Sequence, residues 1–289
     1  MGFPCNGAIR RLIGFIVPLG AFLFFGGFGA QASSIGAIVL GAQKVLGFVQ
    51  VGDGNALTTA YAMFSTNLVS SIPDAYASVT LTYPGPGSPA SLPQINSQAF
   101  GSNTYFSTQA AMDAAYPFGT YTFTADADTA SFTYSADDYP QSLPYLTGND
   151  YTNLQGMDPS QPFTFDFNPF VAGSTATGSE LDFIVVDETQ GISVYSNPLL
   201  PTTTTSVTIP ANTLAGGDSF YYELLYSNFD NNVLPSTGVS GTHVEFDLIT
   251  TGSFTTSSPS VPEPSTVVLS GLALLGAAAL RQKRKAKTL

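Results

Sequence analysis

GTHVEFDLITTGSF, residues 241–254, alternates apolar and polar side chains through its first half. In an extended chain these side chains divide between two faces, with Val244, Phe246 and Leu248 on one face and His243, Glu245 and Asp247 on the other. A period of two residues is typical of a strand that buries one face and keeps the other polar. The stretch is therefore predicted to be a half-buried β-strand.

The same period returns along most of the chain, between turn-forming Gly, Pro, Asn and Asp residues. It occurs in SVTLTY (78–83), TYTFT (120–124), SFTYS (131–135), PFTFDFNPF (162–170), LDFIVVD (181–187), TTSVTIP (204–210) and DSFYYELLYSN (218–228). The short intervals between these predicted strands suit connecting loops and leave little room for crossover helices. We therefore expect an all-β protein of one or two antiparallel β-sandwich domains. A short helix is predicted at residues 108–115, TQAAMDAA, and a second is possible near residues 40–49.

A domain boundary is predicted near residue 158, because LTGNDYTNLQGMDPSQP (146–162) gathers turn formers before a new run of strands. The first β-sandwich domain then covers residues 33–157 and the second covers residues 158–252. By its strand spacing the second segment resembles a fibronectin type III or immunoglobulin-like sandwich. Residues 253–261, SFTTSSPSV, are expected to be a flexible stalk.

The N-terminal residues 1–32 have the pattern of a secretory signal peptide. They contain a basic pair, an apolar run and small residues before the cleavage point, namely Arg10 and Arg11, residues 12–28, and Ala30 and Ala32 ahead of Ser33. Signal peptidase is expected to cut after Ala32. A membrane anchor that is never cut is the alternative.

Residues 262–289 combine a Pro-Glu-Pro triplet, a short apolar run and a basic tail. The triplet is Pro262, Glu263 and Pro264, the predicted transmembrane helix covers residues 265–280, and the tail holds Arg281, Lys283, Arg284, Lys285 and Lys287. A helix of that length reaches only about 24 Å, whereas the bilayer core is roughly 30 Å thick. The positive-inside rule places the tail in the cytoplasm and the body outside.

These three parts, in this order at the C-terminus, resemble the PEP-CTERM sorting signal. The resemblance implies export by a Gram-negative bacterium that makes exopolysaccharide, with an inner-membrane-anchored precursor. It also implies processing by an exosortase, after which the protein reaches the envelope, cell surface or extracellular matrix. An ordinary C-terminal anchor is the alternative, and it leaves the body on the same side of the membrane.

Without its two ends the chain is strongly acidic. Residues 33–264 hold one basic residue, Lys44, against 20 acidic ones, and so a formal charge of −19. Such a charge disfavours binding to nucleic acid or anionic lipid headgroups. It favours solubility and suits divalent cations that bridge carboxylates to an acidic exopolysaccharide.

Cysteine and histidine are too scarce for several kinds of site. Cys5 lies in the signal peptide, so the mature chain has no disulfide and no thiol nucleophile. His243 is the only histidine, which excludes multi-histidine zinc sites. A calcium site is a hypothesis at Asp126, Asp128 or Asp137, although the EF-hand spacing is missing. No other cofactor is expected.

Three functions remain open. The leading expectation is a non-enzymatic exported protein of the cell surface or exopolysaccharide matrix, a setting typical of biofilms. The second is a carbohydrate-binding or adhesive module, which would use loop tyrosines such as Tyr139, Tyr145, Tyr151 and Tyr195. The third is a secreted hydrolase that uses paired carboxylates, which the sequence does not place on facing strands.

Overall fold

The computed structural model describes residues 37–70, 72–232 and 242–258. The predicted signal peptide, the Pro262-Glu263-Pro264 triplet and the predicted span 265–280 with its basic tail lie outside these residues. Within the described ranges, no helix has the length and apolar character needed to cross a membrane.

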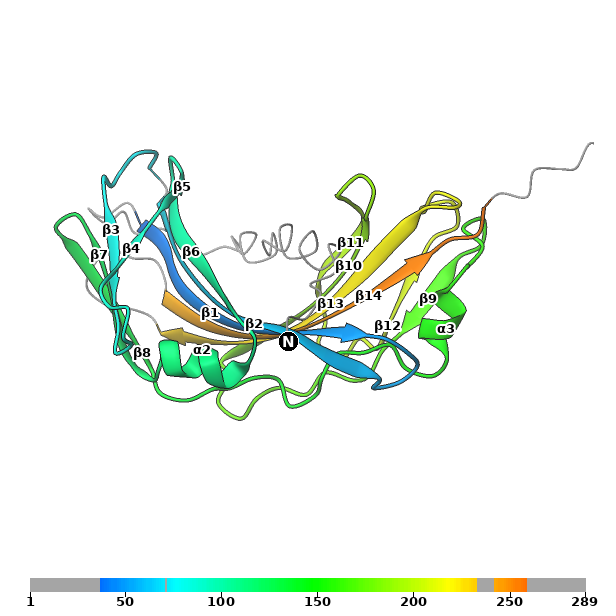
Figure 1. The fold of residues 1–289 in the computed structure, drawn as a ribbon, viewed down its shortest axis with the longest axis horizontal. Coiled ribbons are helices and arrows are strands. Elements are labelled where there is room, and N and C mark those ends of the chain that lie inside the picture. The colour runs from blue at the N-terminus through cyan, green and yellow to red at the C-terminus, as the bar shows by residue number, and fades with distance from the viewer. Residues whose placement is uncertain (1–36, 71, 233–241, 259–289) are drawn as a thin grey trace, which may run out of the picture.

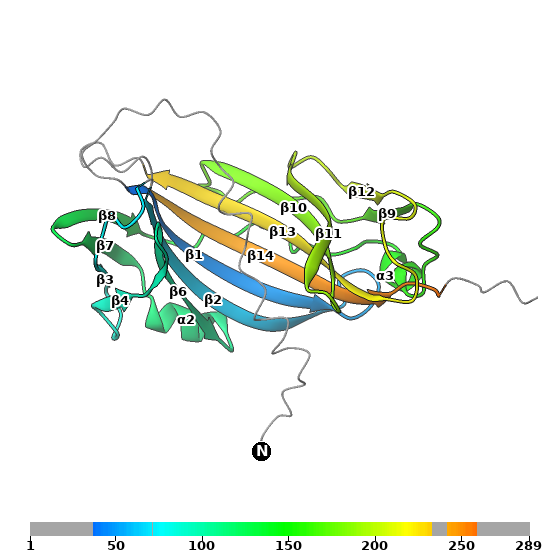
Figure 2. The same cartoon turned by 90° about the horizontal axis from the view of Figure 1, so that it is seen from above.

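An eight-stranded sheet forms the frame of the molecule. Its strands, in spatial order, are β11 (Ile192–Leu200), β10 (Gly178–Asp187), β13 (Ser219–Asn232), β14 (Thr242–Thr255), β1 (Ala37–Gln50), β2 (Leu57–Ser70), β6 (Ala99–Phe106) and β5 (Gln94–Asn96). Neighbouring strands are antiparallel except β1 and β14, which pair in parallel with Val45 opposite Asp247. Figure 2 shows the long strands β1, β2, β13 and β14 running side by side along the molecule.

Two smaller sheets lie on the outer side of this frame, which is bent into a trough (Figure 1). One has four strands in the order β4 (Ala90–Leu92), β3 (Val79–Thr82), β7 (Gly119–Ala125) and β8 (Asp128–Tyr134). The other pairs β9 (Phe163–Asp166) with β12 (Ser206–Ile209). Two short helices, α2 (Gln109–Ala115) and α3 (Asp150–Leu154), complete the described structure.

Each small sheet covers its own hydrophobic core, and both cores share one face of the large sheet. We call this side the core face. On β14, Val244 and Phe246 belong to the first core, whereas Leu248 and Phe254 belong to the second. Leu46 of β1 packs against both. The two cores therefore lie one after the other under strands long enough to reach both.

The predicted all-β class, with sheet packed on sheet, is confirmed. All the strands predicted from period-two patterns are present, and so is the helix at residues 108–115, as α2. Thr108 caps α2 by accepting a hydrogen bond from the backbone N–H of Ala111. Capping of this kind satisfies one of the free N–H groups at a helix start.

Two local predictions are wrong. Residues 40–49 form part of β1 instead of a helix, because they pair with β2 on one side and β14 on the other. Residues 253–255, predicted to begin the stalk, continue β14. The predicted boundary at residue 158 falls between α3 and β9, which both contribute to the second core. The large sheet crosses that boundary, since β1 pairs with β14.

Candidate functional site

Among the described residues, two groups of ionisable side chains lie on opposite faces of the large sheet. Gln43 and Lys44 are neighbours on β1, so strand alternation sends them to opposite faces. Lys44 lies on the core face, among the residues that we call the Lys44 cluster. Gln43 lies on the other face with five carboxyl groups, and we call that side the acidic face.

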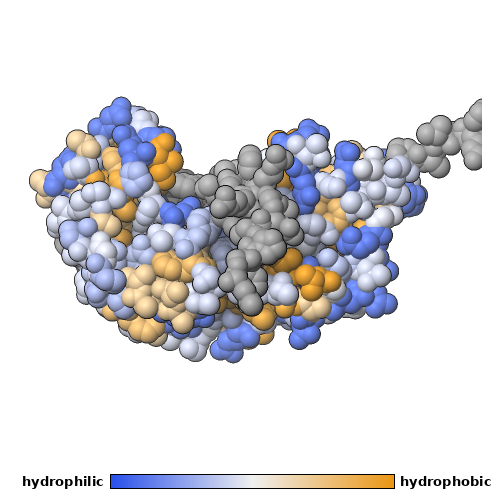
Figure 3. All heavy atoms as spheres, in the orientation of Figure 1, coloured by the Kyte–Doolittle hydropathy of each residue, from blue (hydrophilic) through white to orange (hydrophobic). Residues whose placement is uncertain are grey.

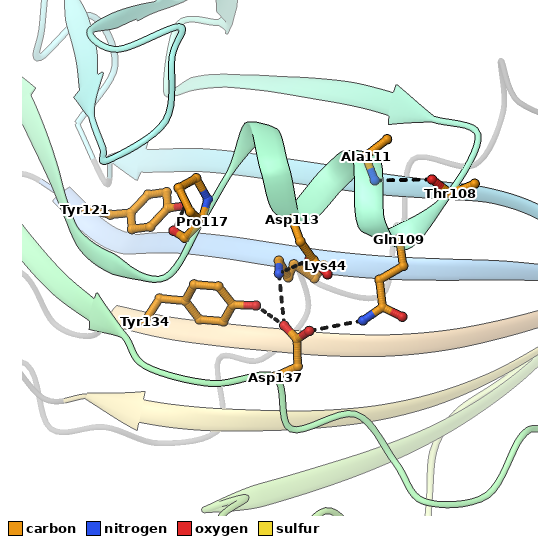
Figure 4. Close-up of polar contacts among 9 residues, drawn as sticks. All are labelled: Lys44, Thr108, Gln109, Ala111, Asp113, Pro117, Tyr121, Tyr134 and Asp137. Carbon is orange, nitrogen blue, oxygen red and sulfur yellow. Dashed lines mark hydrogen bonds and ion pairs between the residues drawn. The ribbon is translucent and has the colours of Figure 1, made fainter.

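The Lys44 cluster is built around the only Lys or Arg residue that the described structure contains. Lys44 is 1% exposed, and its Nζ lies 2.5 Å from Asp113 Oδ1 and 2.9 Å from Asp137 Oδ1 (Figure 4). The same nitrogen lies 4.5 Å from the ring centre of Tyr134 and 5.3 Å from that of Phe118. A buried ammonium is stable only when it is paired, and here two carboxylates and two ring faces surround it.

Three elements bring this cluster together. Lys44 comes from the middle of β1, Asp113 from α2, and Asp137 from the segment that follows β8. Asp137 is held further by the Tyr134 hydroxyl and by Gln109 Nε2 at 3.0 Å, both of which donate to it (Figure 4). Burial, reinforced by the bond to Asp137, raises the pKa of Tyr134. The phenol therefore stays a hydrogen-bond donor.

The acidic face carries Glu180, Asp182, Glu223, Glu245 and Asp247, all buried. The strand register sets Glu180 of β10 opposite Ser227 of β13, and Ser227 opposite Asp247 of β14. Asp247 accepts hydrogen bonds from the Ser227 hydroxyl and from the Gln43 amide. The carboxyl groups thus come from three adjacent strands.

Burial raises the pKa of every carboxyl group on the acidic face. The pKa rises to about 9 for Glu180, where Asp182 adds repulsion, and to about 7 for Glu223 and Glu245. For Asp182 burial is again the largest cause, and the pKa of Asp247 lies well above its usual range because burial and Glu245 both oppose its charge. Lys44 lies on the other face, so its ammonium does not oppose these shifts.

Tyr61 adds an unusual polar group to the acidic face. Its hydroxyl is buried and has no hydrogen-bond partner among the described residues. Its ring lies over Gly47, and it packs in a small cluster with Val45, Met63, Leu225 and Ile249. Burial and the charges of Glu223 and Asp247 raise its pKa, so the hydroxyl stays protonated.

The three aspartates of the calcium hypothesis do not share one place. Asp126 sits in the turn between β7 and β8 and accepts hydrogen bonds from the N–H groups of Ala77 and Ser78 and from the Ser78 hydroxyl. These bonds, the Ala77 bond first, lower its pKa. Asp128 begins β8, and Asp137 lies beyond the other end of that strand. The two ends of β8 are about 20 Å apart at the rise per residue of a β-strand.

Asp137 is paired with Lys44, as described above. Among the described residues, no group of three or more His, Cys, Asp or Glu side chains is arranged to hold a metal ion. Calcium binding at any of these aspartates stays a prediction.

The other candidate residues are also separated by the fold. His243 pairs with Gly41 and Asn231 in the large sheet, and its side chain lies outside the described structure. The four loop tyrosines are half-buried. Three of them pack against the cores: Tyr139, Tyr151 and Tyr195.

The acidic face is the group of residues that sequence reasoning missed. A signal was present, because Glu245 and Asp247 fall on the polar face of the strand pattern, and Asp182 and Glu223 occupy polar positions in two further predicted strands. What the sequence lacks is the strand order and register that make these acids neighbours.

Figure 3 shows that the visible surface is mostly hydrophilic at both ends, with apolar side chains in scattered patches.

Comparison with known proteins gives one clear match, at the C-terminus. Residues 260–285 match the PEP-CTERM protein-sorting motif. This motif implies an exported protein that begins as a membrane-anchored precursor and is processed by an exosortase. No curated protein matches the chain.

Two solved structures are similar at low identity. The FN1–FN3 domains of chicken CNTN1 align with 68% of this chain at 10% identity and a TM-score of 0.23, and the chain spans 63% of their length. A trypsin-activated alpha-2-macroglobulin from Escherichia coli aligns with 70% of this chain at 10% identity and a TM-score of 0.21, over 15% of its own length. The fold described above rests on the strand pairing itself.

Proposed function

We propose that this chain, which carries a PEP-CTERM protein-sorting motif, is a non-enzymatic structural protein of the cell surface or the exopolysaccharide matrix. The observation that carries the proposal is the motif at residues 260–285, directly after an all-β body. In this proposal the motif delivers the body, and an exosortase separates it from the basic tail. Processing near Pro264 leaves a body with one basic and 20 acidic residues.

The arrangement of charges supports a structural role. Lys44 is buried and engaged with two carboxylates, so it serves packing between β1, α2 and the end of β8. On the acidic face, Asp247 accepts hydrogen bonds from Gln43 and Ser227, and burial raises its pKa. The remaining exposed carboxylates keep the body soluble and supply sites where divalent cations link it to acidic polysaccharide.

The sorting step gives the first test. We expect that mass spectrometry of the protein from the producing bacterium finds Ser33 at the N-terminus and a C-terminus near Pro264. Replacing Pro262, Glu263 and Pro264 together by Ala should retain the full C-terminal tail and keep the protein in the membrane fraction. A triple Ala replacement in the basic tail, at Lys283, Arg284 and Lys285, is the comparison that separates the role of the tail from that of the triplet within the same signal.

Recovery of mature protein ending at Leu289 from wild-type cells would contradict the processing step. A mature protein found only in the medium, with none in the envelope or the extracted matrix, would contradict the proposed location.

The activity is tested separately with the purified protein. We expect no turnover of polysaccharide extracted from the same bacterium. Turnover that is lost in Glu245→Gln and Asp247→Asn variants would support the paired-carboxylate hydrolase instead. Specific binding on a glycan array that is lost on replacing Tyr145 by Ala would support the carbohydrate-binding alternative.

A further inference from the structure

We propose that the Lys44 cluster is the site of a self-catalysed covalent cross-link, an isopeptide bond between Lys44 Nζ and Asp113 Cγ, with Asp137 moving the protons. This inference goes beyond the proposed function and does not depend on where the protein is delivered. It concerns a chain whose mature part has no cysteine and therefore no disulfide.

The geometry places the two reacting groups in contact. Lys44 Nζ lies 2.5 Å from Asp113 Oδ1, and because Cγ is one C–O bond beyond that oxygen, the N–C distance is at most about 3.7 Å. Reactants held at about 3 to 3.5 Å in a fixed orientation behave as if present at very high concentration. A small motion of the Asp113 carboxylate brings the pair into that range.

The surroundings of Lys44 favour an amide over a buried ammonium. The Lys44 side chain is 1% exposed and that of Asp113 is 34% exposed, and Lys44 Nζ lies over the rings of Tyr134 and Phe118, which contact each other. Removing the Lys44 ammonium from water is costly, and its attraction to the carboxylates repays that cost only in part. Joining the ammonium to the Asp113 carboxylate as an amide removes these two charges, and the Asp137 carboxylate keeps the Tyr134 hydroxyl and the Gln109 amide as its donors.

The two aspartates differ in a way that assigns their roles. Asp137 is fixed by three donors, namely Lys44, the Tyr134 hydroxyl and Gln109, so its carboxylate is held in place to carry protons. Asp113 is the nearer carboxylate, and Lys44 is the one side chain that the described structure places in hydrogen-bond contact with it. Asp113 is therefore the group that is attacked (Figure 4).

The reaction balances without any added reagent. Asp137 takes one proton from the Lys44 ammonium and passes it to an Asp113 carboxyl oxygen. The nitrogen lone pair then attacks Cγ, and the C=O electron pair moves onto oxygen. A second nitrogen proton passes through Asp137 to the Asp113 hydroxyl, the C–O bond breaks, water leaves, and the C=O bond reforms. One amide and one water replace one ammonium and one carboxylate, and Asp137 returns to its starting state.

The cross-link would join β1 to α2 across a separation of 69 residues in the sequence. Such a bond restricts the unfolded chain as a disulfide does. It would do so without depending on the redox state of the surroundings, which suits an extracellular protein.

The test is peptide mapping of the purified full-length protein. Chymotrypsin suits this chain, which is rich in Tyr and Phe. We expect a branched peptide that joins the Lys44 and Asp113 segments and weighs one water less than their sum. Lys44→Arg and Asp137→Asn should abolish it, and Asp53→Asn, at a distant exposed acid, should leave it unchanged. In Asp113→Asn the branched peptide should form with loss of one ammonia instead of one water.

The wild-type protein decides the question even if a variant does not fold. Separate recovery of the Lys44 and Asp113 peptides, both unmodified, from folded wild-type protein overturns the proposal and leaves an ion pair only. Loss of one water without a branched peptide also overturns it, because a cyclic imide at a single aspartate has the same mass. Neither result tests the sorting step, which is tested by identifying the N- and C-termini of the mature protein.

Discussion

At the residue scale, the neighbours Gln43 and Lys44 of β1 lie on opposite faces of the large sheet, and ionisable groups are buried differently on each face. Lys44 is neutralised by carboxylates from α2 and from the end of β8. One position earlier, Gln43 donates to Asp247 on a face that has no cation among the described residues. Burial raises the pKa of the carboxyl groups on that face, which links the stability of the sheet to pH.

We predict that the protein is more stable in mild acid than at neutral pH. The folded state raises the pKa of Glu223 and Glu245 from 4.5 to about 7, so between these values the unfolded chain binds fewer protons than the folded one. Stability is then fully present below about pH 4.5 and is lost as the pH rises through 7. Chemical denaturation at a series of pH values should show a fall on the order of a few kcal/mol.

The slope of this profile can be assigned to the acidic face. Glu223→Gln should flatten it, because the amide keeps the shape of the protonated acid and cannot ionise. Glu188→Gln, at an exposed acid directly after β10, should leave it unchanged. A free energy of unfolding that increases from pH 4.5 to 7 would show that these carboxyl groups are not held protonated.

At the element scale, β1 shows how pairing overrides local preference. Its sequence LGAQKVLGFV contains Ala, Gln, Lys and Leu, which favour helices in isolation. In the fold β1 has a partner strand on each side along most of its length. Glycine at position 47 also serves the sheet, because the Tyr61 ring of β2 lies across it.

We predict that Gly47→Ala destabilises the protein by about 1 to 3 kcal/mol, the range for overpacking a tight site. An added Cβ would lie 2.3 Å from Tyr61 Cε1, so the ring would have to leave its place. Thermal or chemical unfolding measures the loss. In a Tyr61→Ala background the same substitution should be neutral or stabilising, because the obstruction is gone.

The matched control is Gly52→Ala in the turn after β1, where the nearest atom to an added Cβ is 3.4 Å away. It should have little effect. Equal effects at positions 47 and 52 would mean that the ring contact is not the cause.

At the scale of the whole molecule, one sheet serves two cores. The first core takes Val244 and Phe246 from β14, far along the chain from its other members. The second core takes Leu146 and Leu154 from before residue 158. We predict that residues 33–157 and 158–252 do not fold as separate fragments, since each loses buried partners and leaves a long unpaired strand edge.

Calorimetry and circular dichroism check this prediction. The whole body, residues 33–258, should unfold in a single cooperative transition, whereas each fragment should lack the near-ultraviolet signal of packed aromatic rings. Two independent transitions that match two folded fragments would favour separate domains.

Much of the fold was predictable from particular residues. The alternation of Val244, Phe246 and Leu248 identifies β14, and TQAAMDAA, which begins at Thr108, identifies α2. The acidic face was predictable only as a set of polar strand positions, such as Glu245 and Asp247. Their neighbours depend on β13 and β10, whose register comes from long-range packing that has no local signal.

The sequence by itself determined that the body is an acidic, cysteine-free β structure and that a sorting motif follows it, because period-two patterning, charge and a linear motif are local properties. Only the tertiary structure decided that Lys44 meets Asp113 and Asp137, that five carboxyl groups share one face, and that β14 lies beside β1. These contacts join residues up to about 200 positions apart. They arise when the two cores are buried together, and no local preference along the chain encodes them.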